Sequence, residues 1–297
     1  MTLRTWIAFV ALCAIWGIPY FLIKVALVDF SPAVVAFGRI ALGAAVLAPL
    51  AWHRGSLKLA FAHKGAIIAF AICELVIPFS AIAVAETRIS SSLAGVFIAS
   101  VPLVVALIAP LFGIRERLGG RRAVGLAIGF AGVIALLGID SLESTEQWLG
   151  VACLMFAVIG YAIGPLIVQR YLGDIDEVGA TAASLTVASI ALLPLALYFA
   201  PTHAPSASAI SSVVVLGIIC TALALLLFFY LIQAAGASRA AVVAYINPGI
   251  AALLGVLVLH EPFGVGLIIG LAMILLGSWL ATSGKRESAQ VTETASA

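Results

Sequence analysis

"AAVVAYINPGIAALLGVLVLHEPFG", residues 240–264, is an apolar run that carries Asn247, Pro248 and Gly249 near its middle. Pro248 has no backbone N–H and its ring crowds the carbonyl of Ala244, so a helix here leaves a backbone oxygen without its usual partner. Because lipid offers no hydrogen bond, the stretch predicts a membrane helix whose break faces protein or a water-filled cavity. Two interpretations remain open: a structural kink against a neighbouring helix, or part of a transport site or hinge.

The composition extends this conclusion to the whole chain. Of 297 residues, 64% are hydrophobic and 9% are charged, a balance that excludes an ordinary water-soluble domain. The lipid bilayer is the expected environment, and a net charge of +2 is too small to indicate a nucleic-acid partner. The four cysteines lie inside apolar runs without metal-site spacing, so we expect neither a metal nor a cofactor.

Turn residues and charges divide the chain into ten apolar segments of the length that a bilayer about 30 Å thick requires. The expected fold is an all-α integral membrane protein with ten transmembrane helices. The expected spans are 5–26, 33–52, 65–85, 92–113, 122–138, 148–170, 178–200, 210–233, 238–259 and 263–282.

Basic residues predict the orientation of these spans because cytoplasmic loops retain Lys and Arg. With ten spans, twelve basic residues fall on the side that holds both termini, whereas only Lys24, Arg39 and Arg88 belong to the other side or to spans that open on it. We therefore expect both termini in the cytoplasm. The polar tail, residues 283–297, is expected to be disordered and cytoplasmic.

The chain also resembles itself. A shift of 146 residues aligns Pro102 with Pro248, and a slip of one residue then aligns Glu116 with Glu261. A repeat of about 145 residues holds five spans, and because five is odd, the second copy must enter the membrane from the opposite face. Inverted repeats are typical of secondary transporters that rock two halves about a site near the midplane. We expect a first repeat at 1–138, a periplasmic linker at 139–147 and a second repeat at 148–282.

Residues 228–277, "FFYLIQAAGASRAAVVAYINPGIAALLGVLVLHEPFGVGLIIGLAMILLG", resemble the EamA-type domain of the drug/metabolite transporter superfamily. The first half resembles a more divergent copy, with Trp16-Gly17, Lys24 and Arg39 followed by Pro102 and Glu116. The sixth span departs from the pattern, since it has Gly160-Tyr161 where a second Trp-Gly would stand. The resemblance implies a bacterial inner-membrane exporter with a central cavity. Among substrate classes it favours amino acids, including aromatic and neutral ones.

Two ionisable residues lie where lipid would make them costly, which marks functional candidates. Glu74 is near the middle of the third span, and its own carbonyl is the one that Pro78 leaves unpaired. This carboxyl can bind a substrate ammonium, couple transport to protons, or hydrogen-bond a neighbouring helix. Arg39, in the second span, can hold a substrate carboxylate through its bidentate fork, or it can pair with Asp29 or Glu86.

Aromatic residues on the same helices are candidates for lining the cavity, where rings accept apolar side chains and attract an ammonium. Packing and interfacial anchoring are the competing roles. The expected cavity residues are Trp16, Tyr20, Arg39, Glu74, Phe79, Tyr161, Tyr245 and Asn247. The expected hinge and gate residues are Pro78, Pro102, Pro248, Gly249, Glu116, Glu261 and Lys24.

Enzymatic activity is not expected. His260-Glu261 lacks the second histidine of a zinc helix, and the chain has neither a nucleophile elbow nor a phosphate-binding loop. The sequence thus predicts a monomeric or weakly dimeric secondary transporter that exports amino acids or related small metabolites by alternating access. Efflux of drug-like organic cations and a membrane small-molecule sensor are the alternatives.

Overall fold

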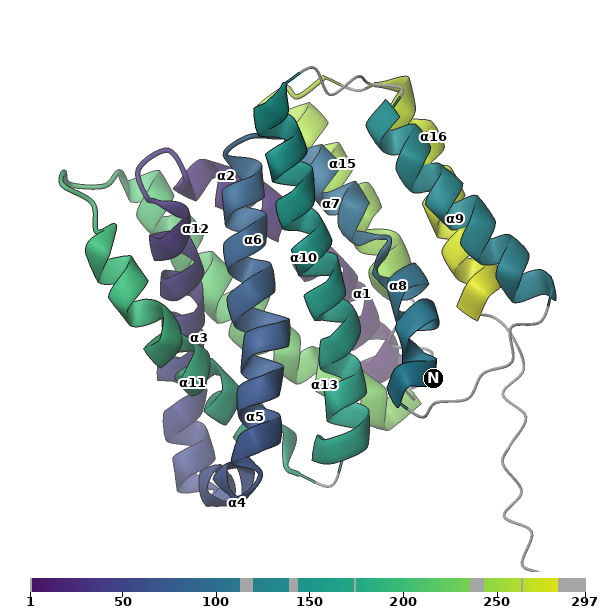
Figure 1. The fold of residues 1–297 in the computed structure, drawn as a ribbon. Helices are drawn as coiled ribbons and strands as arrows, with labels where there is room; N and C mark the ends of the chain where they lie inside the picture. Colours follow the sequence, from purple (N-terminus) through teal and green to yellow (C-terminus); the bar gives the residue numbers. More distant parts are fainter. Residues whose placement is uncertain are drawn as a thin grey trace, which may run out of the picture.

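The computed structural model describes residues 2–112, 120–138, 144–173, 175–235, 243–262 and 264–282 (Figure 1). All regular structure in these ranges is helical. The elements are α1 (Leu3–Gly17), α2 (Pro19–Ala26), α3 (Pro32–His53), α4 (Ser56–Ala62), α5 (Lys64–Phe70), η1 (Ala71–Val76), α6 (Ile77–Glu86), α7 (Ser91–Ile98), α8 (Val101–Ile108), η2 (Ala109–Phe112), α9 (Gly120–Gly138), α10 (Thr145–Ile167), η3 (Val168–Leu172), α11 (Glu177–Tyr198), α12 (Ala207–Gly217), η4 (Ile218–Leu223), α13 (Ala224–Ala235), α15 (Val243–Leu259) and α16 (Val265–Thr282).

Several of these elements join end to end into membrane-spanning lengths. Among the described residues, eight helical stretches are long and apolar enough to cross a bilayer: 3–26, 32–53, 64–86, 91–112, 120–138, 145–167, 177–198 and 207–228. Two shorter apolar helices, at 246–259 and 265–281, follow them. The protein is therefore a multi-pass membrane protein, and the expected tail at 283–297 lies outside the described residues.

One end of the bundle is defined by serine caps. Ser31, Ser90, Ser144 and Ser206 precede α3, α7, α10 and α12, and each side chain accepts a hydrogen bond from a backbone N–H in the first turn of its helix. Such caps satisfy donors that the helix itself leaves free. We call this the Glu86 end, because α6 finishes there at Glu86.

Helices from the two halves of the chain pair side by side throughout the bundle. The pairs are α3 with α11, α6 with α10, α7 with α15, α2 with α12, and α9 with α16. The α9–α16 pair stands at one side in Figure 1, and glycines bring its two backbones together. A Cβ on Gly277 would lie 2.3 Å from the backbone nitrogen of Gly129, so side chains larger than hydrogen are excluded there.

Two spans contain a wide π-helical turn at matching places. The turn η1 lies just before Pro78 in its span. The Ile77 N–H donates to the Ile72 carbonyl, five residues back. The turn η4 holds the same kind of bond, from Ala224 to Ile219. The fourth residue of each turn is polar: Glu74 in η1 and Thr221 in η4. A π turn re-satisfies backbone groups that a regular α-helix would leave unpaired near a proline.

The two prolines of the sequence repeat lie in different surroundings. The span that contains Pro102 is divided by a turn at Ala99 and Ser100, and the Ser100 hydroxyl donates to the Phe97 carbonyl at 2.7 Å. By contrast, α15 continues through Pro248. The first of the two predicted breaks is thus an interruption of the helix, whereas the second lies within a continuous helix.

Candidate functional site

Arg39 lies at the centre of the bundle and is only 4% exposed. Its Nε donates to the Thr221 hydroxyl at 3.2 Å, and its Cζ lies 3.8 Å from the centroid of the Phe79 ring. Among the described residues the guanidinium makes no other hydrogen bond or ion pair. Both terminal nitrogens therefore keep their donors for an acceptor that enters the site, which is the geometry that a carboxylate needs.

Aromatic residues surround this guanidinium. The rings of Phe79 and Tyr161 meet edge to face with centroids 6.5 Å apart, and the Tyr161 and Tyr20 hydroxyls lie within electrostatic range of Arg39. Four helical segments, α2, α3, α6 and α10, supply these residues, and η4 adds Thr221. The predicted cavity residues Tyr20, Arg39, Phe79 and Tyr161 are thus brought together.

Glu74, on η1, also interacts electrostatically with Tyr161. Its Oε2 is buried and has no hydrogen-bond partner. The carboxyl packs on Gly164 of α10, where a Cβ would come within 2.0 Å of Oε2. A carboxyl acceptor and a guanidinium donor therefore both interact with one tyrosine, and each has unused hydrogen-bonding capacity.

The remaining predicted cavity residues are more dispersed. Trp16 stacks against Phe228 of α13, with ring centroids 4.9 Å apart. Asn247, on α15, has a buried Oδ1 without a hydrogen-bond partner. The backbone of Tyr245 belongs to α15, but its side chain lies outside the described residues, as does the whole of Glu116.

Lys24 makes a defined cross-link rather than extending to the surface. Its ammonium donates to the backbone carbonyls of Glu86, at 2.6 Å, and of Ile89, at 2.9 Å. These bonds tie α2 to the connection between α6 and α7.

Glu261 joins α15 to α7 in a way that the sequence analysis did not anticipate. Its carboxylate accepts hydrogen bonds from the Ser91 N–H at 2.7 Å, the Ser92 N–H at 2.9 Å and the Ser92 hydroxyl at 2.6 Å. Burial alone would raise the pKa of Glu261, but the bonds from Ser92 and Ser91 outweigh it and hold this pKa below its ordinary value. The carboxylate therefore caps α7 in its charged form.

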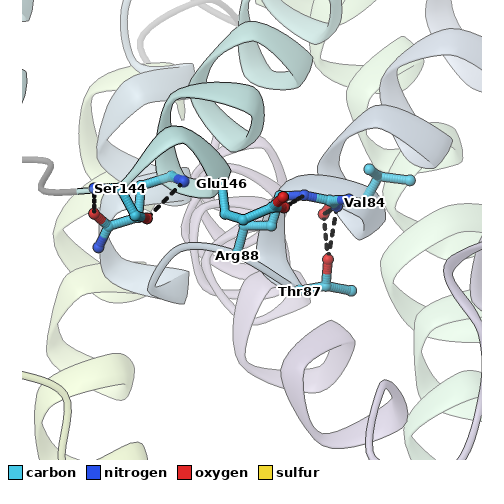
Figure 2. A network of polar contacts seen from close by, with 6 residues as sticks. Val84, Thr87, Arg88, Ser144 and Glu146 are labelled. Atoms are coloured by element: carbon cyan, nitrogen blue, oxygen red, sulfur yellow. Dashed lines mark hydrogen bonds and ion pairs between the residues drawn. The ribbon is translucent and has the colours of Figure 1, made fainter.

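Asp29 does not pair with Arg39. Its carboxylate accepts from the backbone N–H of Ser206 at 2.9 Å and from the Ser206 hydroxyl, and these bonds hold the pKa of Asp29 below its ordinary value. Figure 2 shows a further link at the Glu86 end, where Arg88, in the connection that follows α6, contacts Glu146 of α10 at 2.9 Å. Together with Lys24 and Glu261, these contacts join most of the connections at this end.

Thr221 and Glu86 were not among the predicted site residues. The signal that could have pointed to Thr221 is that a hydroxyl deep in an apolar span needs a hydrogen-bond partner. Glu86 is fully buried, and neither carboxyl oxygen has a hydrogen-bond partner. Gly249 faces the groove that α15 and α16 line with apolar side chains.

Comparison with known proteins places the chain in a family. A model described as the EamA-like transporter family matches residues 4–138 and again residues 148–283. The chain belongs to this family. The inner membrane transporter YedA of Escherichia coli strain K12, named as uncharacterized, is 30% identical over 94% of this chain and 90% of its own length. An uncharacterized transporter of Archaeoglobus fulgidus is 26% identical over 94% of this chain and 98% of its own.

A solved crystal structure of a protein has the same fold, with a TM-score of 0.68 at 21% identity over 93% of this chain and 96% of that chain. The protein is thus a membrane transporter of the EamA type. Its relatives are named as transporters and not as enzymes.

Proposed function

We propose that the protein exports amino acids with neutral or aromatic side chains, or closely related zwitterionic metabolites. One observation carries the proposal: the Arg39 guanidinium and the Glu74 carboxyl are both buried, have unused hydrogen-bonding capacity, and interact electrostatically with the same residue, Tyr161. A zwitterion presents the complementary pair of charges. The Arg39 fork binds the carboxylate, Glu74 receives the ammonium, and the rings of Phe79 and Tyr161 accept the side chain.

The proposed mechanism is alternating access between two inverted five-span repeats, ten spans in all. The helix pairs support this mechanism. If each span is replaced by its counterpart five positions away in the other half, the pair α6–α10 becomes the pair α12–α2. The pairs α3–α11, α7–α15 and α9–α16 are each converted into themselves. A pseudo-twofold axis in the membrane plane has this property. The site then lies where the halves meet, since Arg39 comes from the first repeat and Thr221 from the second.

The proposed orientation puts both termini in the cytoplasm and the Glu86 end toward the periplasm, on the basis of the distribution of basic residues. The cross-links from Lys24, Asp29, Arg88 and Glu261 all lie at the Glu86 end. They support a conformation that is closed toward the periplasm. We further infer that Pro102, Pro248 and Pro78 let the spans bend between the two states.

Efflux of organic cations is the second candidate, and the surroundings of Glu74 favour it. A buried carboxyl beside aromatic rings suits a cation without a carboxylate. Arg39 separates the two candidates, because an organic cation gains nothing from the guanidinium and is repelled by it, whereas a zwitterion uses it.

The test is uptake of labelled amino acids and one labelled organic cation into liposomes that contain the purified protein, without a pH gradient. Saturable uptake of neutral and aromatic amino acids, competed by their unlabelled forms, is the expected result. Protein-free liposomes give the background. Saturable uptake of the cation alone would overturn the amino-acid proposal in favour of the second candidate.

A further inference from the structure

Glu86 ends α6 as a fully buried carboxyl whose two oxygens lack any hydrogen-bond donor. An ionised carboxylate in such a place loses its hydration without compensation, which costs several kcal/mol, whereas a protonated carboxyl avoids most of that cost. The geometry of the closed Glu86 end therefore fits a neutral, protonated Glu86.

Lys24 is close to Glu86 but does not neutralise its side chain. The Lys24 ammonium donates instead to the backbone carbonyls of Glu86 and Ile89, and no ion pair joins the ammonium to the carboxyl. A charged Glu86 would compete with these carbonyls for the ammonium, because a carboxylate is the stronger acceptor. The cross-link between α2 and the α6–α7 connection thus depends on Glu86 being neutral.

Other charged and titratable groups face Glu86 from the elements around it. Glu261 is an anion held by Ser91 and Ser92 of α7, and it disfavours a second negative charge at Glu86, whereas Arg39 and Lys24 favour one. Near the same end, Glu146 is engaged with Arg88. The groups that interact electrostatically with Glu86 are Tyr20 and Lys24 from α2, Arg39 from α3, and Glu261 after α15.

We propose that Glu86 is a proton-binding site that latches the Glu86 end. In the closed state the carboxyl keeps its proton and Lys24 holds the two carbonyls. When the end opens, water reaches Glu86, the proton leaves to that water, and the carboxylate draws the Lys24 ammonium off the carbonyls. Closure takes one proton back. The inference rests on the proposed alternating access, but not on the amino-acid substrate.

The direction of the pH effect follows from this exchange of one proton. Acid favours the protonated, closed form and alkali favours the open form. For a single site, the ratio of closed to open molecules changes by at most about tenfold for each pH unit.

The test measures the opening itself and needs no substrate. Spin labels at Ile210 of α12 and Leu149 of α10, both exposed, report the distance across the Glu86 end in the full chain, with the four native cysteines replaced by alanine. As the pH is raised from about 5 to about 9, a longer distance is expected to appear, because alkali removes the proton from Glu86. A distance distribution that does not respond to pH overturns the proposal.

The decisive variant is Glu86→Gln, which is expected to keep the short distance at every pH because it mimics the protonated form. Glu146→Gln, at the same end, is the matched control and should respond as the parent does. A pH response that survives in Glu86→Gln overturns the proposal. Should this variant fail to fold, Glu86→Asp keeps a proton site on a shorter side chain and must shift the pH midpoint; an unshifted midpoint also overturns it.

The two proposals can fail separately. If the pH response stands while liposome uptake of amino acids fails, the substrate class is wrong and the latch is retained. If uptake stands while the pH response or its dependence on Glu86 fails, the latch is wrong and the transport proposal is retained.

Discussion

Of the three π-helical turns in the described residues, η1 in the first half of the chain and η4 in the second lie at matching places but differ in chemistry. In η1 the fourth residue is Glu74, whose Oε2 has no partner. In η4 it is Thr221, whose hydroxyl donates to the Leu216 carbonyl at 2.8 Å and accepts from Arg39. Each turn also reaches the opposite half, since Glu74 packs on Gly164 and Thr221 holds Arg39. The two turns thus carry unequal side chains, and under the proposed function η1 is a binding element whereas η4 supports Arg39.

The largest expected effect comes from removing the cation that η4 supports. Arg39→Met should lower amino-acid flux into liposomes by about 30-fold or more, since losing one partner of a buried charge contact costs about 2–5 kcal/mol. Arg39→Lys should restore part of the flux, because it keeps the charge but loses the fork. Arg54→Met, at the exposed end of the same helix, is the control. Unchanged flux in Arg39→Met would remove Arg39 from the site.

The next test concerns the charged residue of η1. Glu74→Gln should raise the KM for amino acids by about tenfold or more, the range of a hydrogen bond to a charged group. It should leave the KM unchanged for carboxylate analogues that lack the ammonium. Equal loss for both substrates would show that Glu74 acts on the fold and not on the ammonium, and loss of a pH dependence of transport would instead make it a proton site.

A variant of Glu261 tests whether the stability of the protein depends on the cross-links between its two halves as well as on the two π-helical turns. Glu261→Gln should lower the stability of the purified protein by about 1 kcal/mol, because a neutral amide accepts the serine donors more weakly. The pKa of Glu261 is depressed in the folded protein, so its stabilisation is present above its ordinary pKa and is lost as the pH falls through the depressed one. Thermal unfolding of both forms should therefore converge in acid; a constant gap would contradict this.

The smallest effects are expected for two glycines, one packed against the Glu74 carboxyl and one with open space around it. Gly164→Ala should reduce amino-acid flux several-fold by displacing the Glu74 carboxyl. Gly249→Ala should leave flux and stability within about 0.5 kcal/mol of the parent, because no atom lies within 4 Å of its would-be Cβ. A clear loss of flux in Gly249→Ala would instead support a hinge there.

The sequence was sufficient to predict a multi-pass membrane protein and to single out Arg39 and Glu74 as costly polar residues inside apolar spans, because apolar length and buried polar residues are local signals. The role of these residues in transport stays a prediction. The sequence was not sufficient to predict the partners. Thr221 lies 182 residues from Arg39, and periodicity says nothing of contacts across such a distance. The π turns escape periodicity as well, since an extra residue in one turn leaves the apolar run unchanged.

The predicted gate residues show the same limit. Lys24 and Glu261 were singled out by position and by family resemblance, but their bonds to Ile89 and Ser92 depend on how the connections meet at the Glu86 end. Glu86 was considered only as a partner for Arg39. Its burial without a donor is a property of the packed structure and leaves no mark on the sequence around it.

The glycine seam between α9 and α16 affects how an alignment of relatives is to be read. Where Gly125 would carry a Cβ, the backbone nitrogen of Ala281 lies only 2.5 Å away, and a Cβ on Gly132 would lie 2.8 Å from that of Ile274. No larger residue fits such positions unless the helices separate. These glycines should therefore vary as little among homologues as Arg39 does, although they contact no polar group of the site. A ranking of residues by conservation alone would place these packing glycines among the transport residues. Only the contact geometry distinguishes the packing residues from the transport residues.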